Sequence, residues 1–400
     1  MITTFYPPFH FGGDAVYVYQ LSNELARRGH EVHVIHCRDA YEISGREKHS
    51  PLPFHPNVTT HTLHGPGTLL SPLVTQQTGR LGFKKKAVEQ ILKKNDFDVI
   101  HYHNCSLVGG IEIFSMGNAI KLLTLHDYWL VCPTHVMFKD RKSACKEPQC
   151  LRCQLSYRRP PQLWRSDASI RRAVQQLDRV LVASRFTTEL HRERGVELPS
   201  EFFPLFCQAM DSGVAAREAG ASEEKPYYLF VGRLEKLKGL QDVLPLFRSR
   251  PDLELRIAGS GSFESTLKDL AGGCYNIHFL GHQQGAELQA LYSGAIATIQ
   301  PSLAYEISPI VIGESWSCKT PLIARNIGAL GEIVQRGQGG LCFNTPEELT
   351  RQLDRLSRDR EERDRLGKNG HAAYEKDWLP ENNIPRYLEI VESIRQAKNA

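Results

Sequence analysis

The stretch Glu306-Ile307-Ser308-Pro309-Ile310-Val311-Ile312-Gly313-Glu314 places two carboxylates around the expected start of a helix. The run Ala297–Gln300 before it has the pattern of a buried strand, so Glu306 is expected in a strand-to-helix loop. Ser308 is expected to cap the helix, and Pro309 to be its first residue, where a missing N–H removes no hydrogen bond. The stretch therefore predicts a strand, a loop and a helix in succession.

The first turn of this helix is expected to bind an anion. The amides of Ile310 and Val311 have no partner inside a helix, and the helix dipole adds positive potential at the same end. Glu314 lies about 8 Å along the axis at 1.5 Å per residue, within reach of another part of the same ligand. Taken alone, the two glutamates are about equally compatible with ligand binding and with two ordinary charges, one in a loop and one on a solvated helix surface.

A second group of charges follows an earlier strand. Tyr227–Val231 is a short aromatic and apolar run, and the loop after it carries Gly232-Arg233 and Lys238. A guanidinium and an ammonium at the carboxyl end of a parallel strand suit a diphosphate. Plain surface cations are the alternative, and the position directly after the strand favours the binding role.

Taken together, these residues resemble the family 4 retaining glycosyltransferases of the GT-B fold. An E-x7-E pattern, here Glu306 to Glu314, lies downstream of a G-R-x4-K pattern, here Gly232-Arg233 to Lys238. The first half resembles the same family in Pro7-Pro8, in Gly12-Gly13 and in residues 25–32, 98–103 and 123–127. The order and spacing of these segments make the resemblance specific.

The resemblance implies an α/β chain with GT-B architecture, in which two Rossmann-like, doubly wound parallel-sheet domains face each other across a cleft. It implies an acceptor-binding domain over residues 1–205, a nucleotide-sugar-binding domain over 206–375 and a helix over 376–400 that crosses back to the first domain. The alternation of short apolar runs with helical patterns favours parallel sheets by itself. The polar stretch Asp211–Lys225 is expected to form a surface segment between the halves.

Hydrophobic periodicity predicts the individual elements. Strands are expected over residues 1–5, 31–36, 99–103, 119–125, 179–183, 227–231, 253–258, 277–280, 297–300 and 321–324. Helices are expected over residues 14–28, 83–94, 240–247, 263–270, 286–292, 309–318 and 346–353.

The implied activity is retaining transfer of a sugar from a nucleotide-sugar donor to a saccharide or polyprenyl-linked acceptor, in cell-surface or exopolysaccharide synthesis. The resemblance assigns catalytic roles to His126, Arg233, Lys238 and Glu306, with His126 facing the donor sugar. Gly12-Gly13 lacks Cβ atoms between the first strand and helix, so a phosphate can approach it, and Asp14 is expected to cap that helix. The expected donor-binding residues are Gly12, Gly13, Arg233, Lys238, Glu306, Ser308, Pro309, Ile310, Val311 and Glu314.

No catalytic metal is expected. Arg233, Lys238 and the helix amides after Ser308 can stabilise the negative charge of a leaving diphosphate. Asp96-Phe97-Asp98 matches a D-x-D metal pattern, but it precedes the strand 99–103 and so lies at the wrong sheet edge. We interpret Asp98 as a strand-entry residue.

Four cysteines form a C-x12-C-x4-C-x2-C pattern in an expected insertion over residues 132–153, namely Cys132, Cys145, Cys150 and Cys153. The spacing of the last pair suits metal ligands, and disulfides are uncommon in cytosolic chains. We expect a structural zinc ion, with an iron–sulfur cluster or free thiols as open alternatives.

Charge is distributed unevenly along the chain. Residues 1–200 carry 26 Lys and Arg against 18 Asp and Glu, whereas residues 201–400 carry 23 against 27. Mixtures of cations and apolar residues over 80–86 and 158–165 suggest docking on an anionic membrane surface, although such runs are also typical of solvated faces. The sequence shows no apolar run of membrane-spanning length, and Met1–Tyr6 does not have a signal-peptide pattern. We therefore expect a cytoplasmic location, which is peripheral on the cytoplasmic face of the membrane if the docking prediction is correct.

Two other functions fit parts of the sequence. A nucleotide-sugar epimerase of the same architecture would share the phosphate site but would need no acceptor cleft. A nucleic-acid-binding protein could use a zinc site and basic stripes, but a net charge of only +4 disfavours it, and no nucleic acid partner is expected.

Overall fold

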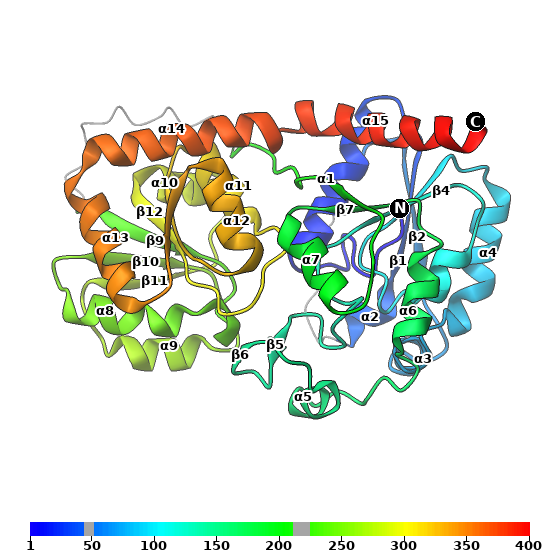
Figure 1. The fold of residues 1–400 in the computed structure, drawn as a ribbon, viewed down its shortest axis with the longest axis horizontal. Helices are drawn as coiled ribbons and strands as arrows, with labels where there is room; N and C mark the ends of the chain where they lie inside the picture. Colours follow the sequence, from blue (N-terminus) through cyan, green and yellow to red (C-terminus); the bar gives the residue numbers. More distant parts are fainter. Residues whose placement is uncertain (44–51, 211–224) are drawn as a thin grey trace. The chain divides into compact units, whose positions relative to one another are not determined.

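The computed structural model describes residues 1–43, 52–210 and 225–400. The expected surface segment therefore lies, apart from its last residue, outside the described residues. The chain divides into two compact units (Figure 1): unit 1 comprises Met1–Val136, Gln149–Leu205 and Asn383–Ala400, and unit 2 comprises Met137–Pro148 and Phe206–Asn382. Unit 2 extends past residue 376, where the crossing helix was expected to begin, and it includes part of the expected insertion.

Parallel strands form the centre of unit 1. The order β3-β4-β7-β8 makes a four-stranded sheet, and β1 pairs with β2. Ile2 forms parallel bridges with Ile35 of β1 and with Tyr102 of β3, so the amino-terminal segment joins the two groups. The strands are β1 Val32–Cys37, β2 Val58–Leu63, β3 Val99–Tyr102, β4 Ile120–Thr124, β7 Arg179–Val182 and β8 Ser200–Phe202.

The predicted strand over residues 1–5 is wrong in extent. Its ladder pairs are limited to Ile2, because the chain turns back at Tyr6, which forms an antiparallel bridge with Phe9. The backbone of this segment still hydrogen-bonds to both neighbouring strands, with Ile2 N donating to His101 O at 2.8 Å and Thr3 N to Ile35 O at 3.0 Å.

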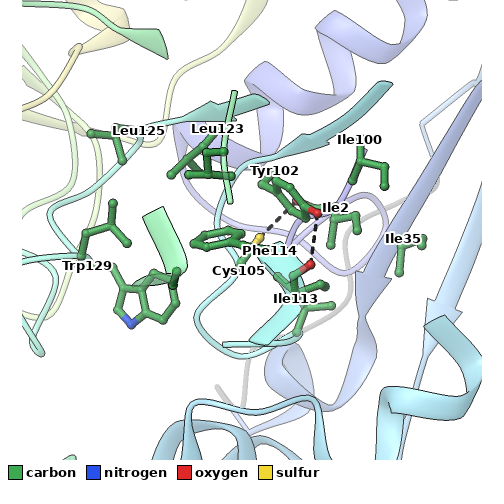
Figure 2. Close-up of a cluster of buried hydrophobic side chains, with 14 of the residues drawn as sticks. Ile2, Ile35, Ile100, Tyr102, Cys105, Ile113, Phe114, Leu123, Leu125 and Trp129 are labelled. Carbon is green, nitrogen blue, oxygen red and sulfur yellow. Dashed lines mark hydrogen bonds between the residues drawn. The ribbon is translucent and has the colours of Figure 1, made fainter. Parts of the chain in front are cut away.

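Figure 2 shows the part of the unit 1 core around this segment. Ile2, Tyr102 and Leu123 are buried there together with the side chains of β1, β3 and β4. The Tyr102 hydroxyl donates to the Ile113 carbonyl at 3.1 Å, and the Cys105 thiol donates to the Ile2 carbonyl at 3.7 Å. Since these polar atoms are partnered inside the core, burying them does not leave a hydrogen bond unmade.

Helices and short turns complete unit 1. They are α1 Gly13–Arg27, α2 Arg38–Glu42, α3 Leu70–Thr78, η1 Gly82–Lys84, α4 Lys85–Lys94, η2 Glu112–Ser115, α5 Cys150–Ser156, α6 Asp167–Val174, α7 Arg185–Glu193 and, from Asn383 onward, α15 Pro380–Asn399. Contacts that attach α15 to the rest of unit 1 include a hydrogen bond from Arg386 to the Phe202 carbonyl at 2.6 Å and an ion pair between Lys398 and Asp178 at 2.7 Å.

Unit 2 contains a six-stranded parallel sheet with the order β11-β10-β9-β12-β13-β14. Successive residues of β9 face opposite sides of this sheet. Tyr228 and Phe230 pack with α8, α9 and α13, whereas Tyr227 and Leu229 pack with α10. Both faces are therefore covered, as the doubly wound prediction requires, and the predicted fold class is confirmed.

The elements of unit 2 follow one another as β5 Phe138–Lys139, β6 Ser143–Ala144, β9 Tyr227–Val231, η3 Lys236–Lys238, η4 Leu240–Asp242, α8 Leu244–Ser249, β10 Glu254–Ala258, α9 Glu264–Ala271, β11 Ile277–Gly281, α10 Gly285–Gly294, β12 Ala295–Gln300, α11 Ile310–Ser317, β13 Leu322–Arg325, α12 Gly328–Gly337, β14 Gly340–Phe343, α13 Pro346–Arg358 and α14 Arg360–Asp377. The predicted helices over 83–94 and 240–247 both begin with a 3₁₀ turn, η1 and η4, before the α-helix starts.

Candidate active site

The strand order of unit 2 reverses at β9. The chain runs from β9 to β10 and β11 on one side, and then crosses to β12 on the other side of β9. The loops after β9 and β12 therefore diverge at the carboxyl edge of the sheet, which is where open parallel sheets bind ligands. Residues 232–239 leave β9 and residues 301–309 leave β12, so both motifs found in the sequence lie at this edge.

Lys238 and Glu306 form an ion pair between these two loops. Lys238 Nζ lies 2.7 Å from Glu306 Oε1, and the side chains are 18% and 17% exposed. The Ser302 hydroxyl donates to the same carboxylate oxygen at 2.7 Å. Burial by itself raises the pKa of Glu306, but Lys238, Ser302 and Arg233 outweigh it and hold this pKa below its usual value. Glu306 is therefore an anion held by two donors at the point where the loops meet.

Gly239 allows the two loops to approach each other. Its φ is +77°, and a Cβ added there would lie 2.0 Å from the Pro301 carbonyl oxygen. The Leu303 amide donates to the Leu237 carbonyl at 2.8 Å and closes the same contact. Any side chain at position 239 would push the loops apart, because both the backbone angle and the available space require glycine.

Arg233 lies on the same loop but is more open to solvent. Its Nη1 is 3.8 Å from Glu235 Oε1, and its side chain is 52% exposed. At this distance the pair is an ion pair and not a hydrogen bond. The charge of Arg233 also contributes to lowering the pKa of Glu306, so the structure brings all three predicted charges to one edge.

The start of α11 differs from the prediction. The helix begins at Ile310, and Pro309 takes the N-cap position with φ −66° and ψ 119°, which is extended backbone. Ser308 therefore does not cap the helix, and its hydroxyl is buried without a hydrogen-bond partner. Ile310 and Val311 remain in the first turn, so the predicted anion site keeps its amides but loses its predicted cap.

Glu314 lies in α11 and is held by a tyrosine that the sequence analysis did not select. The Tyr292 hydroxyl, from α10, donates to Glu314 Oε2 at 2.7 Å. Burial raises the pKa of Glu314, and the Tyr292 hydrogen bond offsets this only in part. The two glutamates of the motif thus differ in environment: Glu306 is paired with a cation, whereas the described contacts of Glu314 come from a neutral hydroxyl.

Unit 1 has an equivalent carboxyl edge, where Gly12 precedes α1. Gly12 takes the N-cap position with φ +84°, so glycine is required there and α1 begins at Gly13. Asp14 does not cap the helix as expected. Its carboxylate instead accepts a hydrogen bond from Asn104 Nδ2 at 3.2 Å, and burial raises its pKa.

His126 follows β4 at this edge and pairs with a second histidine. Its Nε2 lies 3.0 Å from Nδ1 of His103. His103 is the residue directly after the neighbouring strand β3. Burial lowers the pKa of His126 to about 4 and that of His103 well below its usual value, so both rings are neutral at pH 7. His103 Nε2 is buried without a partner. Since an unpaired lone pair costs less than an unpaired N–H, this favours His103 Nδ1–H as the donor and leaves the His126 proton on Nδ1.

Family models match most of the chain. Residues 11–200 match the model described as Glycosyltransferase Family 4, and residues 214–373 match the model described as Glycosyl transferases group 1. The chain belongs to the family 4 glycosyltransferases. An uncharacterized glycosyltransferase of Methanocaldococcus jannaschii is 26% identical to it over 90% of this chain and 88% of the relative.

Solved structures show the fold of this glycosyltransferase. A sucrose-phosphate synthase from Thermosynechococcus elongatus superposes with a TM-score of 0.75 at 20% identity, covering 99% of this chain and 98% of the other. Anabaena HepE, solved in complex with UDP-glucose, superposes with a TM-score of 0.64 at 16% identity, covering 100% and 99%. The GT-B fold expected from the sequence is confirmed. Within the described ranges, no helix has the length and apolar character needed to cross a membrane.

The four clustered cysteines of the glycosyltransferase do not form an evident metal site. Cys132, Cys150 and Cys153 belong to unit 1, whereas Cys145 lies in the segment 137–148 that groups with unit 2. Burial raises the pKa of the Cys150 thiol, and the nearby Cys132 and Cys153 add to the effect. Among the residues with described positions, no group of three or more potential ligands is placed to hold a metal ion. The zinc ion therefore stays a prediction from the sequence.

Elemental analysis of protein purified without added metal tests this prediction. We expect about one zinc ion per chain, as in closed four-thiolate sites, and loss of that zinc in the Cys150→Ser/Cys153→Ser variant. Cys274→Ser, a matched change at an isolated cysteine of unit 2, is expected to keep the zinc. Metal-free protein in which all four thiols react would contradict the site, and iron with visible absorbance would indicate a cluster instead.

Proposed function

We propose that this glycosyltransferase moves a sugar from a nucleotide-sugar donor to a saccharide or lipid-linked acceptor, with retention of configuration and without a catalytic metal. The observation that carries the proposal is the Lys238–Glu306 pair, which joins the loops after β9 and β12 at the reversal of strand order. Such an edge binds nucleotides in open parallel sheets. Anabaena HepE, which shares the fold, has been solved with UDP-glucose.

Charge at this edge supports departure of a nucleoside diphosphate. Negative charge develops on the leaving phosphate, and preorganised cations stabilise it. Lys238, Arg233 and the first-turn amides of α11 are positive groups on this edge, and in the proposed reaction they stabilise that charge without a metal. Asp98 of the D-x-D pattern is not expected to bind a catalytic metal, because it precedes β3 and pairs with Arg395 at 3.0 Å.

The proposed chemistry is attack on the face from which the diphosphate departs. The acceptor oxygen forms a bond to the anomeric carbon, the bond from that carbon to the phosphate oxygen breaks, and the acceptor proton moves to the leaving phosphate. Glu306 accepts hydrogen bonds at the sugar end, and Glu314 does so at the ribose end. Family membership favours transfer over the epimerase alternative, and an acceptor-linked product separates the two experimentally.

Thermal stabilisation by a panel of UDP-, GDP-, ADP- and dTDP-sugars tests the donor assignment. A donor at a hundred times its dissociation constant should add about 2.7 kcal/mol to the free energy of unfolding. NMR of the product anomer tests retention, and turnover in EDTA tests metal independence. If the folded protein is not stabilised by any member of the panel, the donor assignment fails.

Tyr292→Phe should weaken donor binding without changing the chemical step. The variant removes the hydroxyl that holds Glu314, so we expect the donor KM to rise about three- to tenfold at constant kcat, within the range for an ordinary intramolecular hydrogen bond. It should also reduce the preference for a nucleoside diphosphate over its 2′-deoxy and 3′-deoxy analogues. Tyr275→Phe removes an exposed hydroxyl of the same unit, 3.5 Å from the Pro251 carbonyl, and serves as the control. An unchanged ribose preference in Tyr292→Phe would rule out the positioning role.

A further inference from the structure

The basic stripe expected over residues 80–86 is less exposed than its sequence suggests. Lys84 is buried, and its Nζ donates to the hydroxyls of Ser71 at 3.0 Å and Thr75 at 3.2 Å. Burial lowers the pKa of Lys84. Lys85 pairs with Glu112 at 2.8 Å. Lys84 therefore does not belong to the exposed cations of residues 80–86, because two hydroxyls on α3 supply polar partners for it inside the protein.

This inward ammonium group determines which side of α3 faces the protein. Ser71 and Thr75 are 1% and 0% exposed, whereas Leu69, Leu70 and Leu73 are 65%, 49% and 38% exposed. A helix packed on a core normally shows the opposite arrangement, with leucines inside and hydroxyls outside. Three leucines at the start of α3 are thus exposed to solvent, whereas Ser71 and Thr75 of this helix are buried.

Further apolar side chains extend this surface. Phe83, on η1 directly after α3, is 50% exposed, and Leu163 is 88% exposed. Trp164, next to Leu163, donates from Nε1 to the Gln76 carbonyl of α3 at 2.7 Å, so the segment that carries Leu163 lies against α3. Of the ten large apolar side chains exposed in the described ranges, only Tyr275 lies outside unit 1. The apolar docking surface consists of Leu69, Leu70, Leu73, Phe83 and Leu163.

Cations outnumber carboxylates beside this surface. Residues 51–88 and 148–166, the two segments that form it, contain no Asp or Glu. Arg80, Lys86 and Arg158 within these segments are exposed. The carboxylate of Glu112, which reaches this region, is paired with Lys85. The surface therefore combines exposed apolar tips with an excess of positive charge.

We propose that this surface docks the enzyme on an anionic lipid bilayer. Leucine and phenylalanine tips can enter the boundary between headgroups and acyl chains, while flanking Arg and Lys side chains contact lipid phosphates. The complementarity of charge favours a lipid surface over a second copy of this chain, whose matching surface would carry the same positive charge. The inference goes beyond the donor assignment and does not depend on it, although a lipid-linked acceptor would be reached from such a surface.

Sedimentation with vesicles tests the proposal on the 400-residue chain. We expect binding to phosphatidylglycerol vesicles at low salt, much weaker binding to phosphatidylcholine vesicles, and release by salt. Leu70→Ser/Leu163→Ser and Arg80→Ser/Lys86→Ser should each weaken binding about tenfold or more, since interfacial binding depends on both apolar area and charge. Tyr275→Ser and Arg358→Ser/Lys368→Ser, matched exposed changes on unit 2, should bind as the wild type does.

Three results would overturn the proposal: no binding of the wild type to phosphatidylglycerol, equal loss in the unit 1 and unit 2 variants, or a wild-type dimer in light scattering that Leu70→Ser/Leu163→Ser converts to monomer. Melting temperature verifies that each variant is folded. Hydrolysis or transfer of a soluble donor, measured without vesicles, should be unchanged in all of them. Failure of the donor assignment would show as a lack of stabilisation by nucleotide-sugars while vesicle binding persists, so the two inferences fail separately.

Discussion

Replacing Lys238 or Arg233 by alanine is expected to reduce kcat by about 30- to 1000-fold, equivalent to about 2–4 kcal/mol in activation free energy. Both cations follow β9, and both act on the charge that develops on the leaving diphosphate. The loss should appear in kcat and kcat/KM together, because the interaction strengthens as the bond to phosphate breaks. Steady-state kinetics with the donor identified by thermal stabilisation provides the measurement.

The two variants should differ in stability, which separates catalysis from folding. Arg233 is 52% exposed, so Arg233→Ala should keep the wild-type melting temperature. Lys238→Ala leaves Glu306 without its cation and should lower the melting temperature as well. Lys268→Ala is a matched control, since Lys268 also pairs with a glutamate at 2.7 Å in unit 2 but is 54% exposed. Wild-type turnover in both Lys238→Ala and Arg233→Ala would end the diphosphate assignment.

Glu306→Gln should reduce transfer by about 10- to 100-fold, the range expected when a charged hydrogen-bond acceptor becomes neutral. The amide keeps the shape of the side chain but loses the negative charge that Lys238 and Ser302 hold in place. We therefore expect a greater effect on kcat/KM than on unfolding. Equal relative losses in activity and in stability would point to a structural role for Glu306.

The pH dependence of stability gives an independent check on Glu306. Its pKa is lowered in the folded protein, so its ionised form adds stability above the unfolded pKa of about 4.3, and this contribution disappears as the pH falls through the folded value. The difference in unfolding free energy between wild type and Glu306→Gln should thus be present at neutral pH and should shrink on acidification below about pH 4. A difference that is constant through this range would contradict the ion pair.

Much of the fold was predictable from local patterns. The runs Tyr227–Val231 and Ala297–Gln300 are apolar because each is buried in a sheet covered on both faces, and such strands are recognisable without an alignment. Elements with weaker patterns were missed, among them β2, whose residues Val58–Leu63 include three threonines and a histidine, and the four-residue β14. Short or half-exposed segments give too little periodicity to identify.

The site was predictable where a residue lies in the loop that follows a parallel strand. Arg233, Lys238 and Glu306 lie in such loops of unit 2 and His126 in one of unit 1, and the parallel strands of each sheet bring their carboxyl ends to one edge of that sheet. His103 could have been found in the same way. Tyr102 of β3 pairs with Leu123 of β4, so His103 and His126 follow neighbouring strands. Tyr292 could not, because it reaches Glu314 from a helix that carries no motif.

The sequence by itself determined the fold class, the family and the set of charged residues at the carboxyl edges, because these depend on periodicity and on the order of strands and loops. Only the tertiary structure decided three local features. Pro309 is extended, so α11 starts one residue later than predicted; Lys84 is buried, and the leucines of α3 are exposed. The physical reason is clear for Lys84 and α3. Whether a polar group is capped, buried or exposed depends on which distant atoms can satisfy its hydrogen bonds, and for Lys84 those atoms are hydroxyls on a different helix.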